Sequence, residues 1–470
     1  MSALAQYLAF LGSKVSGSDR SLDRGAEAEK GIYFQSLGIR LCPQDGTGVD
    51  GCSCLVVSTA IESQNPEVQR AKILGIPVVH RSDMLAELAR LRNTIAISGT
   101  SGKSTVTGMT YHVLEAGGLN PSLITGANLI SLQAEGLLGN AKAGKPKTQN
   151  RNISEMQNRN ASEAPEWLVM EADESDGSLV KYSPEVGVIL NVEKDHKEIA
   201  ELVPLFKQFR DQTLGSVLLN GSDFQCLALK RKEDILFYSD TIIDGKAENI
   251  RFEDWNTEFT LAGVAFQVHV PGKHNLSNAM AAISVGRMLG ISLEACARGL
   301  KNYLGVERRH VLIGVTNGVT IVDDFAHNPA KVKACLETVK KAADGTKRRV
   351  LAIFHPHGFA PMKLLGHDLV DGILEVLESS DRVYMPEIYY AGGTADKTIS
   401  SADLIARVNG GNISQHNPKS PMGFFFATKE EVITDIIREA RPGDWIVSMG
   451  ARDPSLGDFA QRLFEGLSRK

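Results

Sequence analysis

The residues whose types and spacing point most clearly to a chemical function lie at positions 99 to 105, where the sequence reads Gly-Thr-Ser-Gly-Lys-Ser-Thr. Backbone N–H groups of a tight glycine turn bind oxyanions, a lysine neutralises phosphate charge, and a hydroxyl directly after that lysine can bind Mg²⁺. An apolar run at 94–97 and an amphipathic run at 106–114 flank the segment, which predicts a strand, a phosphate-binding turn and a helix. A chance Gly-Lys-Ser surface turn is the alternative. The predicted phosphate-binding residues are Gly99, Thr100, Ser101, Gly102, Lys103, Ser104 and Thr105.

Two further apolar runs, at 167–170 and 186–191, lead into acidic clusters. The first cluster reads Glu-Ala-Asp-Glu-Ser-Asp from Glu171, and the second contains Asp195 and His196. In a parallel sheet both strand ends would lie beside the phosphate loop, where a Mg-nucleotide needs oxygen and imidazole ligands. The alternative is that these are solvated loop charges.

Two polar segments follow later in the chain. Residues 272–278 run into an alanine-rich helix expected at 279–289; here Asn275 reads equally well as a helix cap, whereas the Asn278 amide could contact an adenine edge. Residues 319–329 read as a strand that ends in Asp-Asp-Phe-Ala-His-Asn-Pro, with a helix expected at 330–343. Both segments place polar side chains at the start of a helix.

Composition bounds the class of protein. With 470 residues, 43% of them hydrophobic, the chain can form about three domains. The net charge of -5, from 51 basic and 56 acidic residues, gives no bulk affinity for nucleic acid or anionic membranes. We find no apolar run of membrane-spanning length and no signal sequence, so a cytoplasmic location is expected. The six scattered cysteines predict reduced thiols without a structural metal, with all but Cys52 and Cys54 as small core residues.

Alternating strand and helix patterns define three regions. Residues 1–92 predict a small parallel α/β domain, with buried strands at 55–59 and 77–80. The sequence begins within an expected helix at 3–11, so the first strand and glycine-rich loop of this domain read as missing, through a late-assigned start or a reduced domain. Residues 93–304 would form a central nucleotide-binding domain and 305–470 a second doubly wound domain. The polar tract at 141–166 is expected to be a mobile surface loop.

Taken in order, these motifs resemble those of the Mur ligase family. The similarity rests on the phosphate loop, the Glu-Ala-Asp-Glu-Ser-Asp cluster, Asp195-His196, the run at 273–279, Arg308-Arg309 and the Asp-Asp-Phe-Ala-His-Asn-Pro motif. Within the first region, Asn65-Pro-Glu and the stretch 81–87 add to it. The branch it resembles most joins UDP-N-acetylmuramate to L-alanine, and a related branch adds a murein tripeptide instead.

The resemblance implies three domains, for the uridine nucleotide, ATP and the incoming amino acid. It implies that ATP converts the muramate carboxylate into an acyl phosphate, which the amino group then attacks. Lys103, His196 and His327 would be catalytic, with Asn328 near the reacting carboxylate, and Ser104, Glu171 and His196 would hold Mg²⁺, with Asp173 and Glu174 as rivals to Glu171. His274, Asn275 and Asn278 would face adenine, and Arg309 and Asp324 the phosphates and ribose. A monomer or homodimer without nucleic-acid or membrane partners is expected.

Some positions depart from the family pattern. The segment 355–363 keeps a Pro-His pair but lacks the arginine-rich continuation of the alanine-adding branch, and Met362-Lys363 is similar to the tripeptide branch. Other branches carry a carbamoylated lysine, for which Lys207 is the nearest candidate. A non-ligase ATP-binding regulator and a ligase that binds precursor without catalysis are the competing interpretations. ATP turnover that depends on an added amino acid would distinguish an active ligase from both of these alternatives.

Overall fold

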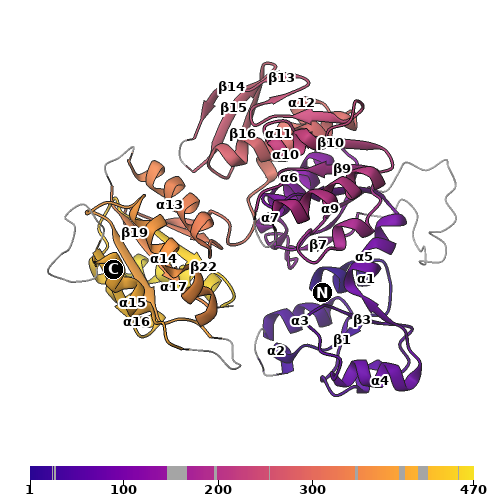
Figure 1. Ribbon diagram of the computed structural model, residues 1–470, viewed down its shortest axis with the longest axis horizontal. Coiled ribbons are helices and arrows are strands. Elements are labelled where there is room, and N and C mark those ends of the chain that lie inside the picture. The colour runs from indigo at the N-terminus through magenta and orange to yellow at the C-terminus, as the bar shows by residue number, and fades with distance from the viewer. Residues whose placement is uncertain are drawn as a thin grey trace. The chain divides into compact units, whose positions relative to one another are not determined.

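Two compact units make up the computed structural model (Figure 1). The first comprises Met1–Arg251, Thr257–His269 and Lys273–Val306, and the second Phe252–Asn256, Val270–Gly272 and Glu307–Lys470. The structure describes residues 1–23, 25, 28–144, 167–194, 198–252, 255–344, 348–390, 397–410, 422–453 and 455–470. Each unit is described below by itself.

A seven-stranded sheet forms the centre of the first unit. Its order is β11-β10-β9-β5-β8-β6-β7, and all neighbours are parallel except β6 and β7. Continuous apolar runs suit strands that are covered on both faces. The bounds are β5 Asn93–Ser98, β6 Ser122–Ile124, β7 Ala141–Lys142, β8 Trp167–Glu171, β9 Val186–Ile189, β10 Ser216–Asn220 and β11 Ile235–Phe237.

Helices cover this sheet on both sides. Helix α6 packs against α11 and α12, while α9 contributes Phe206 and Phe209 to a core shared with Tyr7 of α1. Smaller antiparallel elements complete the unit: β12 with β13, and a sheet of β14, β15 and β16. The bounds are α6 Lys103–Ala116, α7 Ile130–Gln133, η2 Ser178–Lys181, α9 Ile199–Gln212, α10 Phe224–Leu229, β12 Thr241–Ile242, β13 Gly245–Lys246, β14 Glu248–Arg251, β15 Thr257–Leu261, β16 Val264–Val268, α11 Lys273–Met288 and α12 Leu293–Asn302.

The N-terminal part of the first unit contains two separate parallel strand pairs, β1 with β2 and β3 with β4. Helices α1 and α5 pack into the core of the large sheet, and Gln6 donates to the Asn140 side chain at 2.8 Å. Arg81 and Asp176 form a 2.7 Å ion pair. The bounds are α1 Ser2–Phe10, β1 Ser16–Gly17, α2 Arg20–Asp23, α3 Ala28–Ser36, β2 Arg40–Leu41, η1 Thr47–Val49, β3 Leu55–Val57, α4 Pro66–Leu74, β4 Val78–His80 and α5 Arg81–Arg90.

The second unit is built on a six-stranded sheet of order β17-β18-β22-β19-β20-β21. Only β17 runs antiparallel to its neighbour, which agrees with the doubly wound domain predicted for this region. Strand β22 pairs in parallel with both β18 and β19, which come from a distant part of the sequence. The carboxyl ends of these three strands therefore lie side by side. The bounds are β17 Val311–Thr316, β18 Val319–Asp324, α13 Pro329–Asp344, β19 Val350–His355, α14 Phe359–Leu374, β20 Arg382–Pro386, α15 Ser401–Val408, β21 Met422–Phe426, α16 Lys429–Glu439, β22 Trp445–Gly450 and α17 Leu456–Ser468.

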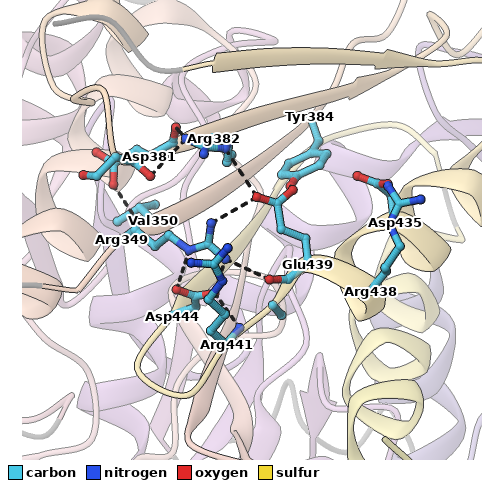
Figure 2. A network of polar contacts seen from close by, with 12 residues as sticks. Arg349, Val350, Asp381, Arg382, Tyr384, Asp435, Arg438, Glu439, Arg441 and Asp444 are labelled. Atoms are coloured by element: carbon cyan, nitrogen blue, oxygen red, sulfur yellow. Dashed lines mark hydrogen bonds and ion pairs between the residues drawn. The ribbon is translucent and has the colours of Figure 1, made fainter. Parts of the chain in front are cut away.

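At the amino ends of these strands a polar network joins β19, β20, α16 and the turn before β22 (Figure 2). Arg349 donates to both carboxylate oxygens of Asp444, at 2.8 and 3.0 Å, and to Glu439 at 3.0 Å. Glu439 also accepts from the Tyr384 hydroxyl at 3.0 Å. A planar guanidinium that satisfies two carboxylates fixes the relative positions of the elements that carry them. This network stabilises the sheet at the amino ends of its strands, whereas the candidate site residues described below lie at the carboxyl ends.

The structure corrects several sequence predictions. Helix α6 is buried on all sides over residues 104–114 rather than amphipathic, because α11 and α12 also cover it. Helix α11 begins at Lys273, six residues before the expected start at 279. Strands β3 and β4 are half-buried or exposed because each has a single partner. Cys42 is half-buried instead of a core residue.

The polar tract at 141–166 also needs correction at its start, because residues 141–142 pair with β6 as strand β7. Residues 145–166, the rest of the predicted mobile loop, lie outside the described part of the chain. The six cysteines are free thiols, as predicted. Among the described helices we find none long and apolar enough to cross a membrane.

Candidate nucleotide-binding site

The turn between β5 and α6 has the form predicted for a phosphate loop. Gly99 has a φ of 141° and Gly102 a φ of 83°, conformations that residues with a side chain rarely adopt. A Cβ at Gly102 would also stand 2.9 Å from the Asn278 side-chain oxygen. Helix α6 then starts at Lys103, so its N-terminal N–H groups point toward the turn. Glycine is therefore required here both for backbone geometry and for close packing.

Asn191, which follows β9, braces this loop. Its Oδ1 accepts hydrogen bonds from the Thr100 hydroxyl and the Ser101 N–H, both at 2.8 Å, and its Nδ2 donates to the Ser101 carbonyl at 3.1 Å. The Thr100 hydroxyl in turn accepts from the Glu193 N–H at 3.0 Å. We did not predict a role for Asn191 from the sequence. The available signal was a polar residue at the end of the run 186–191.

Glu171 gathers hydroxyl and amide groups at the end of β8. Its Oε2 accepts from Ser104 Oγ at 2.9 Å, from Thr125 Oγ1 at 3.0 Å and from the Gly126 N–H at 3.0 Å. Ser104 is 1% exposed, so its hydroxyl is held in place against the carboxylate. A carboxylate beside two hydroxyls supplies the hard oxygen ligands that Mg²⁺ prefers. The residues present thus fit a Mg²⁺ site.

Lys103 forms a separate ion pair with Glu174. Its Nζ lies 2.7 Å from Glu174 Oε2, donates to the Gly99 carbonyl at 2.8 Å and is 3.8 Å from Asp173 Oδ1. Burial raises the pKa of the Glu174 carboxyl, an effect that the Lys103 charge only partly offsets. Three of the four acidic residues of this cluster therefore differ in environment: Glu171 faces Ser104, Glu174 holds Lys103, and Asp173 is half-buried.

The predicted adenine-side residues lie on the first turns of α11. Asn278 donates to the Asn275 side chain at 3.1 Å and lies against Gly102, as noted above. Asn275 is buried within the helix, whereas His274 is exposed. The interpretation of Asn275 as a helix cap is wrong because α11 starts two residues earlier. Asn278 is thus placed beside the phosphate loop.

In the second unit, Asp324 at the end of β18 is enclosed by donors. It accepts from the His310 N–H at 2.8 Å and the Ala326 N–H at 2.7 Å, and its Oδ2 lies 3.0 Å from His310 Nδ1. Burial alone would raise the pKa of Asp324, but the His310 charge and these hydrogen bonds outweigh it and lower the pKa. The neighbouring Asp323 pairs with Arg308 at 3.0 Å, and burial raises its pKa to about 6. Arg309, which follows Arg308, is half-buried.

Histidines gather at the same end of this sheet. The His327 and His357 rings lie 5.7 Å apart, and Asn328 caps α13 by accepting from the Lys331 N–H at 2.9 Å. Burial lowers the pKa of His357 to about 4 and that of His355 to about 3. Both are neutral at physiological pH. His327 is thus placed among predicted second-unit residues, beside His357 of the Pro-His pair that the sequence analysis noted without assigning this histidine a role of its own.

His196, predicted as a catalytic residue and Mg²⁺ ligand, lies outside the described residues. Lys207 is 60% exposed and pairs with Asp211 at 2.8 Å on the surface of α9, an environment unlike that of a metal-bridging carbamate. Within the described residues His310, Asp324 and Cys335 bring potential metal ligands within 4.8 Å of one another, although the hydrogen bonds above already engage Asp324.

Three family profiles match successive parts of the sequence. They are the Mur ligase family catalytic domain at residues 1–93, the Mur ligase middle domain at 97–286 and the Mur ligase glutamate ligase domain at 308–452. The chain belongs to the Mur ligase family. The phosphate loop with Glu171 falls in the middle-domain match, and Asp324 with His327 in the third.

Individual Mur ligases are similar over the full length. UDP-N-acetylmuramate–L-alanine ligases of Pelotomaculum thermopropionicum and Rhizobium etli are each 33% identical, covering 96% and 100% of this chain and 92% and 96% of theirs. Among solved structures, the UDP-N-acetylmuramate-alanine ligase of Thermotoga maritima matches with a TM-score of 0.74 at 22% identity, covering 99% of this chain and 96% of that one. A murein peptide ligase of Psychrobacter arcticus matches with a TM-score of 0.64 at 21% identity, covering 100% and 97%. The structural likeness supports the three-domain Mur ligase fold.

Proposed function

We propose that this Mur ligase is an ATP-dependent, ADP-forming ligase that joins the carboxylate of UDP-N-acetylmuramate to L-alanine in the synthesis of peptidoglycan precursors. The observation that carries the proposal is the 33% identity, over 96% to 100% of the chain, to ligases named for that reaction. The arrangement of Lys103, Ser104 and Glu171 around a glycine turn supports it, because the reaction begins with transfer of a phosphoryl group.

The proposed chemistry has two steps. The muramate carboxylate attacks the γ-phosphorus of ATP and ADP leaves; the amino group of alanine then attacks the acyl phosphate carbon, and inorganic phosphate leaves. Lys103 and the loop N–H groups would stabilise charge on the transferring phosphoryl group. Asn278 would contact adenine, with His274 and Asn275 on the same helix. Arg309 and Asp324 are proposed to contact the phosphates and ribose.

Mg²⁺ would be held by Ser104 and Glu171, together with His196. When bound, the cation would neutralise phosphate charge. Ser104 and Glu171 already lie 2.9 Å apart, so little rearrangement of these two side chains is needed. His327 and Asn328 are proposed to lie near the reacting carboxylate, and the neutral state of the adjacent His357 would leave that region without an added positive charge.

The predicted regions 1–92, 93–304 and 305–470 are proposed to bind the uridine nucleotide, ATP and the amino acid. We further propose cytoplasmic action by a monomer or homodimer, without nucleic-acid or membrane partners.

A murein tripeptide is the second candidate acceptor. Met362 and Lys363 on α14 are similar to the tripeptide-adding branch, as noted above, and the segment before them lacks the arginines of the alanine-adding branch. Both lie near the start of α14, the helix that follows the end of β19, and substrates bind at such strand ends in doubly wound folds; Met362 itself is buried in the core. They bear on the acceptor and leave the ATP-dependent first step unchanged.

The decisive experiment measures phosphate release from MgATP and UDP-N-acetylmuramate with L-alanine, L-serine, glycine or murein tripeptide, with product mass as a second readout. L-alanine is expected to give the largest stimulation, and Lys103→Ala to reduce it by at least about 100-fold. Lys142→Ala, which alters a lysine paired with Glu135 on the surface, is the control and should retain activity. Stimulation by tripeptide alone would favour the second candidate. Failure of every acceptor would refute ligase activity.

A further inference from the structure

The phosphate-loop lysine is engaged by a protein carboxylate in this structure. Lys103 Nζ and Glu174 Oε2 are 2.7 Å apart, the usual distance for an ammonium and an anionic oxygen. The two side chains are only 13% and 5% exposed, so solvent screens the pair weakly. The Glu174 carboxylate thus makes the kind of contact with Lys103 that a nucleotide phosphate oxygen would make.

Glu174 is separated from the groups assigned to Mg²⁺. Glu171 faces Ser104, Thr125 and Gly126, whereas Glu174 contacts Lys103. Asp173 is 3.8 Å from the same ammonium and its side chain is 37% exposed. One carboxylate is therefore suited to the cation and another to the lysine.

A phosphate and the Glu174 carboxylate cannot both contact Lys103 without like-charge repulsion in a poorly solvated site. We propose that Glu174 is an internal competitor of the nucleotide, which neutralises Lys103 in the nucleotide-free protein and releases it when the phosphates bind. This inference rests on the ATP binding of the proposed function. Because ADP also carries a phosphate beside the loop, Glu174 would weaken the binding of product as well as substrate.

The competition explains why a buried acid is useful here. Without Glu174 the buried ammonium of Lys103 would keep only the Gly99 carbonyl and the more distant Asp173 carboxylate, which would compensate its charge less well in the empty site. With Glu174 present the empty site is stable. The Lys103 contact then contributes to nucleotide binding only the difference in free energy between a Lys103–phosphate contact and the Lys103–Glu174 contact that it replaces. Burial raises the pKa of Glu174 and so makes its charge costly once the lysine turns to a phosphate, which favours movement of the side chain.

The test compares the full-length protein with Glu174→Gln and Asp173→Asn. Each variant removes one negative charge near Lys103, but only the first removes the charge that lies 2.7 Å from the ammonium. Dissociation constants of ATP and ADP are measured by calorimetry, once in EDTA and once with Mg²⁺. Glu174→Gln is expected to bind both nucleotides about tenfold more tightly in each condition. In EDTA, where no cation ligand is at work, Asp173→Asn is expected to change binding less than about threefold.

Two further readouts guard against a purely structural effect. Glu174→Gln is expected to lower the melting temperature of the nucleotide-free protein and to recover it at saturating ATP, because only the empty site loses its ion pair. Glu174→Asp, which retains the charge but shortens its reach, should bind ATP with an affinity between those of wild type and Glu174→Gln.

The inference is overturned if Glu174→Gln binds ATP no more tightly than wild type in EDTA. Weaker binding only when Mg²⁺ is present would overturn it by making Glu174 a cation ligand. If the wild-type protein binds no ATP in either condition, both this inference and the proposed function fail. Normal wild-type binding with an unchanged Glu174→Gln variant rejects the competitor role alone.

Discussion

Replacing Asn191 by alanine should weaken nucleotide binding although Asn191 is not assigned a contact with the nucleotide. Its side chain makes three hydrogen bonds to Thr100 and Ser101, at 2.8, 2.8 and 3.1 Å. A neutral hydrogen bond contributes about 1 kcal/mol net, and Ser101 is exposed, so the three together order the loop by about 2 kcal/mol. If the phosphate loop of Asn191→Ala must be ordered when the nucleotide binds, this cost of about 2 kcal/mol lowers the affinity for ATP about thirtyfold.

The assay is calorimetric titration of ATP into wild type, Asn191→Ala and a matched control, Asn220→Ala. Asn220 is matched to Asn191 because it is also an asparagine near the end of a strand, here β10, the neighbour of β9. It donates to the Leu190 carbonyl at 2.9 Å and accepts from the Ser222 N–H at 2.9 Å. Neither of these contacts involves a residue of the phosphate loop. It should therefore show a comparable loss of thermal stability with little change in ATP affinity.

The reasoning would be refuted by Asn191→Ala binding ATP as tightly as wild type while its melting temperature falls. That result would mean that the loop keeps its conformation without the brace, through its glycines and its attachment to α6. A loss of affinity in both variants would instead point to general destabilisation of the sheet.

Two other predictions concern charge. Glu171→Gln should raise the Mg²⁺ concentration for half-maximal phosphate release at least about tenfold, because a neutral amide replaces an anionic ligand. The control is Glu115→Gln, which alters a glutamate at the far end of α6 and should leave this concentration unchanged. Chelation of Mg²⁺ should stop turnover of the wild type. The buried His355 has its pKa lowered to about 3 from an ordinary 6.5, so stability is present above pH 6.5 and is lost as pH falls toward 3. Between pH 6.5 and 5 the loss is about 2 kcal/mol, measured by urea unfolding, and His355→Phe should show a smaller loss over that interval; an equal loss would contradict it.

The sequence by itself determined the local architecture of the nucleotide site. A strand of apolar residues, glycines at 99 and 102 and a lysine at the helix start predict a phosphate loop because backbone conformation depends on neighbouring residue types. The alternation of strands and helices likewise predicted doubly wound domains. The resemblance to Mur ligases, carried by ordered motifs, was confirmed by the family profiles.

Only the tertiary structure decided which side chains meet. Glu171 and Glu174 are three residues apart in one acidic cluster, yet one faces Ser104 and the other Lys103, because the path of the chain after β8 turns them to different partners. Asn191 braces a loop some 90 residues away in sequence since β9 lies beside β5. Helix α6 is buried on all sides because two later helices pack on it. Local patterns specify backbone shape, whereas partner choice depends on non-local packing that residue spacing does not encode.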